Sequence, residues 1–338
     1  MADNEQNSLR ISLIFRKNRE HGFSIEKIFR QLGDIIAQKA TVQQVYVPEI
    51  KASPLHIWKN IRSGKSLSAD IFHITGDIHY MVMAFPRKKT ILTIHDCVFL
   101  YQSNGLKKWL LKLIFLKLPV KRSRLITTIS DKSRREIIEN SGCDPEKVVV
   151  VPNPVGDLFY YRQHSFRQEQ PVLLFIGSTP NKNIERVIEA IKGIPCLLHI
   201  VGNLTAHAKN LLEMNNIQYE QREGLSEQAL ADAYADCDIV MFPSTYEGFG
   251  LPVVEGQKSG RPVITSNISP MKEVAAEGAC LVDPYDTASI RQGVCKIMAD
   301  AEYRDQLVKK GFENVKQYEA VAIAERYLQV YKRVKIND

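Results

Sequence analysis

CDIVMFPSTYEGFGLPVVEGQKSGRPVITS, residues 237–266, is the stretch that decides the fold. The apolar run Asp238–Phe242 predicts a buried strand, and Gly248 and Gly250 predict a tight loop followed by a helix. Pro252 suits the first turn of that helix, because a missing N–H costs nothing there. Glycines let backbone N–H groups approach a ligand closely, and a helix N-terminus offers further unpaired donors. We therefore expect a ligand to bind at this strand–loop–helix unit.

Two carboxylates, Glu247 and Glu255, flank the loop with seven residues between them. We expect Glu247 to lie before the helix and Glu255 in its first turn. Each carboxylate could accept hydrogen bonds from vicinal hydroxyls, one pair on a sugar and one on a ribose. Glu255 alone has a second interpretation, because a first-turn glutamate also complements the helix dipole. The two carboxylates together with the glycines and Pro252 favour a binding site.

Short β-branched runs alternate with helical patterns along the whole chain, which predicts parallel sheets built from βαβ units. The runs lack strict alternation, as expected when helices cover both faces of a sheet. The predicted strands are RISLIF, QQVYVP, DIFHIT, KTILTIH, RLITTIS and KVVVVP in the first half and PVLLFIG, CLLHIVG, IQYEQ, CDIVMFP, RPVITS and ACLVD in the second. The fold class is therefore α/β with doubly wound sheets.

A polar, turn-rich segment near residues 152–170 separates the two series of strands and predicts a linker. We expect an N-terminal domain at residues 1–160 and a C-terminal domain at residues 161–317. The last helix, at about 318–338, is expected to pack back on the N-terminal domain. A nucleotide would bind in a cleft between the two sheets, at the carboxyl ends of their strands.

The charge of the 338-residue chain is unevenly distributed around a net value of +7. Residues 1–153 hold 25 Lys and Arg against 14 Asp and Glu, and the rest of the chain holds 20 against 24. The first half is therefore expected to meet an anion, which could be nucleic acid, anionic lipid or pyrophosphate.

The sequence contains neither a long apolar run nor a secretory signal, so the cytoplasm is the expected location. The six cysteines are scattered without a C-x-x-C pair, which predicts reduced thiols and no zinc site.

The motif E-G-F-G-L-P-V-V-E resembles the E-x7-E motif of glycosyltransferase family 4, and the resemblance covers nearly the whole chain. The family has the GT-B fold, with two Rossmann-like domains that face a central cleft. The resemblance implies that Glu247 contacts the donor sugar and Glu255 the ribose. It also implies that the loop backbone at Gly248, Phe249, Gly250 and Leu251 faces the sugar and the diphosphate.

A second element, FIGSTPNKNIERVIEA at residues 175–190, is similar to the family's G-R-x-x-P-x-K-N segment. Lys182 matches the lysine that neutralises the leaving diphosphate, and Gly177 matches the glycine. The arginine is missing, because Ser178 follows Gly177. Either hydroxyl and backbone donors at Ser178 and Thr179 replace it, or another base such as Arg222 does.

Three further segments resemble family elements. The loop at Arg222 and Glu223 lies where the family binds the nucleobase through its backbone. His95, at the end of the strand KTILTIH, matches a histidine that faces the donor sugar, and Asp96 either orients His95 or meets the acceptor. The loop Arg19–Ser24 precedes the first helix, which places Ser24 on the acceptor side. A lone histidine at a strand end also fits a packing or capping role.

The segment GLKKWLLKLIFLKLPVKRSR, residues 105–124, is both basic and apolar. Leu106, Trp109, Leu110, Leu113 and Ile114 recur at helical spacing, and every charged residue is Lys or Arg. One interpretation is a patch that docks on an anionic membrane. The other is a helix whose apolar face packs on the sheet while its lysines extend to water.

The resemblance implies a retaining, metal-independent glycosyltransferase without a cofactor. Its donor would be a UDP- or GDP-sugar, and its acceptor a lipid-linked glycan, in the synthesis of a cell-surface polysaccharide such as lipopolysaccharide. The enzyme would be cytoplasmic and peripheral to the inner face of the cytoplasmic membrane. The alternatives are a GT-B nucleotide-sugar epimerase or hydrolase, and a non-catalytic nucleotide-binding GT-B module. A nucleic-acid binder would explain the basic half but not the Glu-Gly-Phe-Gly loop.

Overall fold

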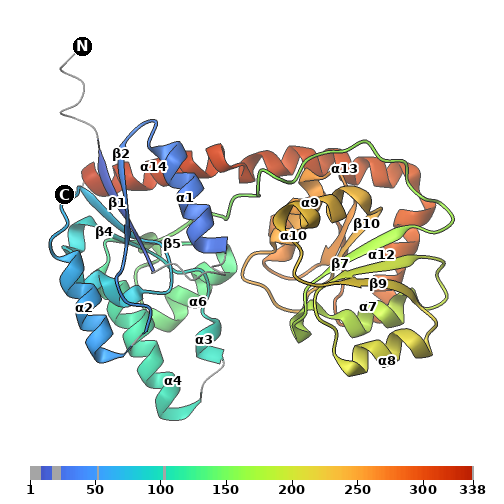
Figure 1. Cartoon of the computed structure of the whole chain (residues 1–338), viewed down its shortest axis with the longest axis horizontal. Coiled ribbons are helices and arrows are strands. Elements are labelled where there is room, and N and C mark those ends of the chain that lie inside the picture. Colours follow the sequence, from blue (N-terminus) through green and yellow to red (C-terminus); the bar gives the residue numbers. More distant parts are fainter. Residues whose placement is uncertain (1–8, 17–23, 52, 102–103, 337–338) are drawn as a thin grey trace. The chain divides into compact units, whose positions relative to one another are not determined.

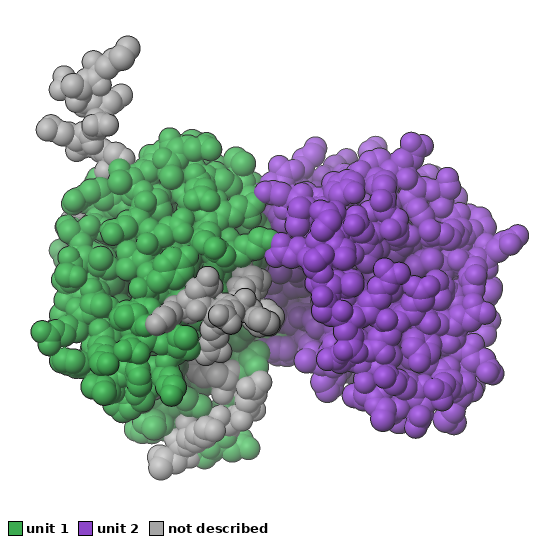
Figure 2. All heavy atoms as spheres, in the orientation of Figure 1, with its two compact units in different colours: residues 1–154, 320–338 green, residues 155–319 purple. Residues whose placement is uncertain are grey.

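The computed structural model describes residues 9–16, 24–51, 53–101 and 104–336, and it divides the chain into two units (Figure 2). Unit 1 comprises Met1–Pro154 and Ala320–Asp338, and unit 2 comprises Val155–Glu319. The first boundary lies six residues before the expected one at residue 160. The reason is that the start of the linker packs on unit 2: the Val155 N–H donates to the Tyr318 carbonyl (2.8 Å) and the Lys258 ammonium to the Gly156 carbonyl (3.1 Å).

Unit 1 is built on a parallel six-stranded sheet in the order β2-β1-β3-β4-β5-β6. Its strands are β1 (Arg10–Phe15), β2 (Thr41–Tyr46), β3 (Ile71–Ile74), β4 (Thr90–Thr93), β5 (Leu125–Thr128) and β6 (Val148–Val150). All residues of β3, β4 and β5 are buried, as expected for the central strands of a sheet that is covered on both faces.

The covering elements of unit 1 are mostly short helices. They are α1 (Ser24–Ile36), α2 (Pro54–Gly64), η1 (His79–Ala84), η2 (Arg87–Lys89), α3 (Val98–Tyr101), α4 (Gly105–Leu111), η3 (Lys112–Lys117), α5 (Leu118–Arg122), α6 (Asp131–Ser141), η4 (Pro145–Lys147) and α14 (Ala320–Ile336). The segment read as one helix from residue 105 is in fact an α-helix, a π-helical turn (η3) and a second α-helix.

The C-terminal helix α14 packs beside α1 within unit 1 (Figure 1). Its buried residues Ile323, Tyr327 and Tyr331 share one hydrophobic cluster with Phe29 of α1 and with β1. A chain that leaves unit 1 at Pro154 thus returns to complete its core.

A buried histidine links α14 to the sheet. His73 on β3 has no exposed surface, and its Nδ1 lies 2.8 Å from the Tyr331 hydroxyl while its Nε2 lies 2.7 Å from the Thr93 hydroxyl. Burial, with a smaller contribution from His95, lowers the pKa of His73 to about 3. The ring is therefore neutral in the folded protein at neutral pH.

We expect this histidine to make unit 1 acid-labile. Below pH 6.5 the unfolded chain binds a proton at His73 that the folded chain does not bind until about pH 3. The free energy of unfolding is therefore unaffected by this proton above pH 6.5. Below pH 6.5 it falls by up to about 1.4 kcal/mol per pH unit. Denaturant unfolding of His73→Gln between pH 7 and pH 5 should show a shallower loss of stability than wild type. His207→Gln, at an exposed site in α8 (Ala206–Met214), should keep the wild-type slope, and equal slopes for all three proteins would contradict the assignment.

Unit 2 is also built on a parallel six-stranded sheet, in the order β12-β11-β10-β7-β8-β9. Its strands are β7 (Val172–Ile176), β8 (Leu197–Val201), β9 (Gln218–Arg222), β10 (Ile239–Phe242), β11 (Val263–Ser266) and β12 (Cys280–Val282). Its other helical elements are η5 (Pro180–Lys182), α7 (Ile184–Ile191), α9 (Glu227–Asp236), α10 (Leu251–Lys258), α11 (Met271–Ala275), α12 (Thr287–Ala299), α13 (Ala301–Val315) and η6 (Lys316–Tyr318). All twelve strands predicted from the sequence are present.

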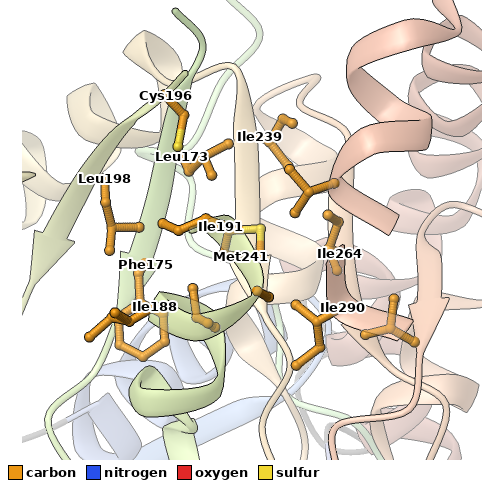
Figure 3. Close-up of a cluster of buried hydrophobic side chains, with 14 of the residues drawn as sticks. Leu173, Phe175, Ile188, Ile191, Cys196, Leu198, Ile239, Met241, Ile264 and Ile290 are labelled. Atoms are coloured by element: carbon orange, nitrogen blue, oxygen red, sulfur yellow. The ribbon is translucent and has the colours of Figure 1, made fainter. Parts of the chain in front are cut away.

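The core of unit 2 fixes the sheet against the helices on one face. Figure 3 shows Phe175 of β7 next to Ile188 of α7, in one hydrophobic cluster with Leu173 of β7, Met241 of β10 and Ile290 of α12. These side chains are fully or almost fully buried. Packing of this kind holds the carboxyl ends of β7 and β10 in place, and the loops that follow them carry the predicted donor-binding residues.

Candidate functional site

The strand order of unit 2 reverses between β7 and β10. From β7 the chain runs outward through β8 and β9, and from β10 it runs outward on the other side through β11 and β12. In open α/β sheets the ends of the strands at such a switch point diverge and leave room for a ligand. The loops after β7 and β10 are therefore where unit 2 is expected to bind a ligand.

Lys182 and Glu247 meet at this switch point. Lys182 ends the turn η5 after β7, Glu247 lies in the loop after β10, and the Lys182 ammonium donates to Glu247 Oε1 at 2.7 Å. Only 20% of the lysine side chain and 14% of the glutamate side chain are exposed. Asn181 also donates to Oε1 (3.3 Å) and to the Tyr246 carbonyl (2.8 Å), which ties the two loops together.

The Gly-x-Gly loop behaves as the sequence predicts. Gly250 has φ +113° and precedes α10, which begins at Leu251 with Pro252 in its first turn. The Phe249 side chain is buried against Tyr318, with ring centroids 5.6 Å apart, whereas Gly248 is partly exposed. The Phe249 ring is thus part of the core, and only its backbone can face a ligand.

Glu255 is the fifth residue of α10, so it lies at the start of the second turn and not in the first turn, as was expected. This correction removes the helix-dipole explanation, because that effect is confined to the first turn. The half-buried carboxyl instead accepts a hydrogen bond at Oε2 from the Tyr234 hydroxyl (2.6 Å). Burial raises the pKa of Glu255 to about 7, against smaller opposing effects of Tyr234 and Lys182.

Gly177 is required by the position of Lys182. Its φ of +126° disfavours any side chain, and a Cβ there would lie 2.4 Å from Cγ of Lys182. The lysine side chain therefore lies directly over the glycine, and its ammonium sits 4.8 Å from the centre of the Phe242 ring. The two residues that resemble the family motif thus form one packed unit.

Gly177→Ala should displace Lys182 in addition to straining the backbone. Gly193→Ala is the matched control, because Gly193 also has a positive φ (+71°) but nothing lies within 4 Å of the added methyl group. We expect both variants to lose about 1–2 kcal/mol of stability through backbone strain. Only Gly177→Ala should also weaken the binding of nucleotide diphosphates measured by calorimetry. Equal binding by the two variants would show that Lys182 does not depend on the glycine.

Ser178 serves the loop framework. Its hydroxyl accepts the backbone N–H of Asn203 (2.6 Å), the residue after Gly202, and a Cβ at Gly202 would lie 2.6 Å from the same oxygen. The side chain of Asn203 faces the Glu223 carboxylate, and its amide nitrogen donates to Glu223 Oε1 (2.8 Å) in the amide orientation that satisfies both groups. Ser178, Asn203 and Glu223 thus connect the loops that follow β7, β8 and β9.

The Arg222 side chain does not point towards Lys182. It is the last residue of β9, and its guanidinium pairs with Glu220 of the same strand (3.3 Å). Both residues line a surface pocket together with His199, which lies opposite Glu220 on the neighbouring strand β8. The structure therefore does not bring the Arg222 side chain to Lys182, and its backbone remains the part that fits the predicted nucleobase loop.

The predicted residues of unit 1 lie at the carboxyl edge of its own sheet. His95 follows β4, and its Nε2–H donates to the Thr75 carbonyl (3.1 Å). Burial lowers the pKa of His95, so the ring is neutral and Nδ1 is left as an acceptor. Asp96 accepts the Val98 N–H (3.0 Å) at the start of α3, so the Thr75 carbonyl and not Asp96 orients the ring.

The predicted acceptor-side loop lies mostly outside the described residues. Ser24 is the first residue of α1, and Arg19–Phe23 are not described. In the described part of the chain no group of three or more His, Cys, Asp or Glu is arranged to hold a metal, and metal independence stays a prediction. Within the same residues no helix is long and apolar enough to cross a membrane.

The sequence interpretation missed two site residues, Asn181 and Tyr234. Asn181 lies within the quoted P-N-K-N segment, so its place beside Lys182 was available as a signal. Tyr234 lies 21 residues before Glu255 and looks like any core tyrosine of an amphipathic helix. The contact of Tyr234 with Glu255 becomes visible only in the structure, where α9 packs beside the site.

Comparison with known proteins agrees with the resemblance to glycosyltransferase family 4. Residues 159–314 match the group 1 glycosyl transferases, and residues 26–157 match Glycosyltransferase Family 4. The fold is that of GT-B glycosyltransferases. One structural neighbour is Anabaena HepE in complex with UDP and glucose (TM-score 0.77, 13% identity, 95% of this chain and 99% of that one). Another is a sucrose-phosphate synthase from Thermosynechococcus elongatus (TM-score 0.75, 19% identity, 97% and 99%).

The chain belongs to the group 1 glycosyltransferases of family 4. Among its curated relatives is the O-antigen chain mannosyltransferase RfbU of Salmonella typhimurium, which is 28% identical over 68% of this chain and 68% of that protein. Another is the O-antigen chain mannosyltransferase B of Escherichia coli, 25% identical over 62% of this chain. The match spans 61% of the length of the latter, less than two thirds.

Proposed function

We propose that this protein is a retaining glycosyltransferase that moves a sugar from a nucleotide diphosphate sugar to a glycan acceptor in the synthesis of a cell-surface polysaccharide. The observation that supports the proposal most is the ion pair of Lys182 with Glu247 at the switch point of unit 2. A cation for a diphosphate and a carboxylate for sugar hydroxyls are held there in one place, next to the N-terminus of α10.

The ion pair suggests how the donor would be bound. Without a ligand, Lys182 and Glu247 neutralise each other in a half-buried place. A diphosphate offers Lys182 a stronger partner, because it carries more charge than one carboxylate. Glu247 can then accept hydroxyls of the sugar, and Glu255 those of the ribose. Donor binding would thus replace one internal ion pair by two sets of ligand contacts.

The catalytic contribution would be electrostatic. Lys182 and the backbone N–H groups at the start of α10 would stabilise the charge that grows on the leaving diphosphate. A diphosphate oxygen on the acceptor's side of the sugar would accept the proton of the acceptor hydroxyl, which needs no protein base and retains the anomeric configuration. We propose that no metal or other cofactor takes part. In unit 1, neutral His95 is suited to accept a sugar hydroxyl at Nδ1.

The curated relatives suggest the sugar. Both relatives described above are mannosyltransferases of O-antigen chains, which makes a mannosyl donor the first choice. We propose that the base of the donor is uracil or guanine, so that the nucleotide is UDP or GDP. Neither Arg222 nor Glu223 chooses between the two, because the predicted contact is made by their backbone.

The test is nucleotide binding and turnover of Lys182→Ala. Wild type should bind either UDP or GDP, and at 100 times Kd the nucleotide should stabilise it by roughly 2.7 kcal/mol in thermal unfolding. Loss of the Lys182 ammonium should lower kcat by about 10²–10³-fold, the range found when a single transition-state donor is removed. Lys192→Ala, at an exposed lysine after α7, is the control and should behave as wild type.

Three outcomes would contradict this proposal. Release of free sugar or an epimerised product in place of a glycoside would identify a hydrolase or an epimerase. Absence of binding for both nucleotides would identify a non-catalytic module. An inverted anomeric configuration, measured by NMR of the product, would exclude a retaining mechanism.

We also propose that the acceptor is carried on a lipid and that unit 1 docks peripherally on the inner face of the cytoplasmic membrane. In the segment Gly105–Arg122, Trp109, Leu110, Ile114 and Leu118 are 59%, 47%, 38% and 45% exposed, while Leu116 and Val120 are buried. Most of the apolar residues that the packing interpretation assigned to the sheet thus face outward. The segment also carries Lys108, Lys112, Lys117 and Lys121, and its described residues include no acid, which fits an anionic surface.

Vesicle sedimentation tests the docking surface. Wild type should bind vesicles of phosphatidylglycerol and phosphatidylcholine but not vesicles of phosphatidylcholine alone, and high salt should weaken binding. Replacing Trp109 and Leu110 together by Ser should reduce binding several-fold. Met214→Ser is the control, because this 78%-exposed methionine lies in unit 2. Equal binding by the double variant would contradict the proposal.

A further inference from the structure

The Glu255 carboxyl has a partner that neither the resemblance nor the comparisons assign. Tyr234, on α9, is fully buried, and its hydroxyl donates to Glu255 Oε2 at 2.6 Å. The Tyr234 ring is fixed in turn by Phe159 in the linker, with ring centroids 5.1 Å apart at an angle of 89°. The donor of this hydrogen bond therefore has little freedom to move.

A buried, fixed donor restricts the carboxyl in two ways. It holds the carboxyl group in one rotation, and it uses one lone pair of Oε2, so Oε1 keeps both of its lone pairs for a ligand hydroxyl. It also favours the ionised form, because a hydrogen bond to a carboxylate stabilises its charge. Both effects prepare Glu255 to bind a hydroxyl before any ligand arrives.

We propose that Tyr234 is a positioning residue that holds Glu255 with Oε1 directed at the ribose hydroxyls of the donor. This inference rests on the proposed function, since it takes Glu255 as the ribose-binding residue. Tyr234 itself does not touch the nucleotide. Its role is to fix the direction and the charge of the carboxylate that does.

The charge of Glu255 gives this role a signature in the pH dependence of binding. Burial raises the pKa of Glu255, and two described groups oppose it, Tyr234 from α9 and Lys182 from η5; the net pKa is about 7. The ionised carboxylate accepts hydroxyls better than the protonated acid. Nucleotide affinity should therefore fall as the pH drops through 7, by at most about tenfold per pH unit for one proton.

Tyr234→Phe removes the hydroxyl and keeps the ring against Phe159, so the variant should fold. Loss of a hydrogen bond to a charged group should raise the pH midpoint of nucleotide binding by about one to two units. At pH 7 the variant should bind UDP or GDP, whichever wild type binds, roughly tenfold more weakly. At pH 9 the difference should shrink, and 2′,3′-dideoxy forms of the nucleotide should bind both proteins equally. Tyr219→Phe on β9 is the matched control.

The outcomes separate this inference from the proposed function. If wild type binds neither UDP nor GDP, the proposed function fails. If wild type binds one of them and Tyr234→Phe has the same affinity and the same pH midpoint, Tyr234 does not position Glu255. A weaker binding that is equal at every pH, and equal for the dideoxy nucleotide, would show a packing role and overturn the inference as well.

Discussion

The ion pair of Lys182 with Glu247 depends on one constraint, the direct pairing of the parallel strands β7 and β10. Parallel neighbours end at the same edge of a sheet, so the loops that follow them must meet. Because β10 begins a new series of strands on the other side of β7, no third strand separates the two loops. Residues 65 positions apart thus come within hydrogen-bond distance.

The same edge explains why glycine and a buried tyrosine accompany the charged residues. Lys182 can reach Glu247 only by lying over Gly177, which leaves no room for a side chain. Glu255 can keep a carboxyl in a half-buried place only with a donor beside it, which Tyr234 supplies. Uncharged neighbours thus help to orient the charged side chains of the site before a ligand binds.

The sequence predicts the fold of each unit well, because the strands are short apolar runs whose limits are set by turn residues. It also predicts that Lys182 and Glu247 lie in loops that follow strands, because each comes shortly after a predicted strand. It does not predict the turn of α10 on which Glu255 lies, since the start of a helix depends on the backbone angle of Gly250. Nor does it predict that Tyr234 meets Glu255, that Ser178 binds Asn203, or that Trp109 faces outward, because each depends on how separate helices and loops pack.

The most direct test is a crystal structure of the protein with the nucleotide diphosphate that it binds. Our account predicts that the diphosphate separates Lys182 from Glu247 and contacts the ammonium and the start of α10. The ribose hydroxyls should lie on Glu255 Oε1, with Oε2 still bonded to Tyr234. A nucleotide bound elsewhere, with the Lys182–Glu247 pair intact, would contradict the account.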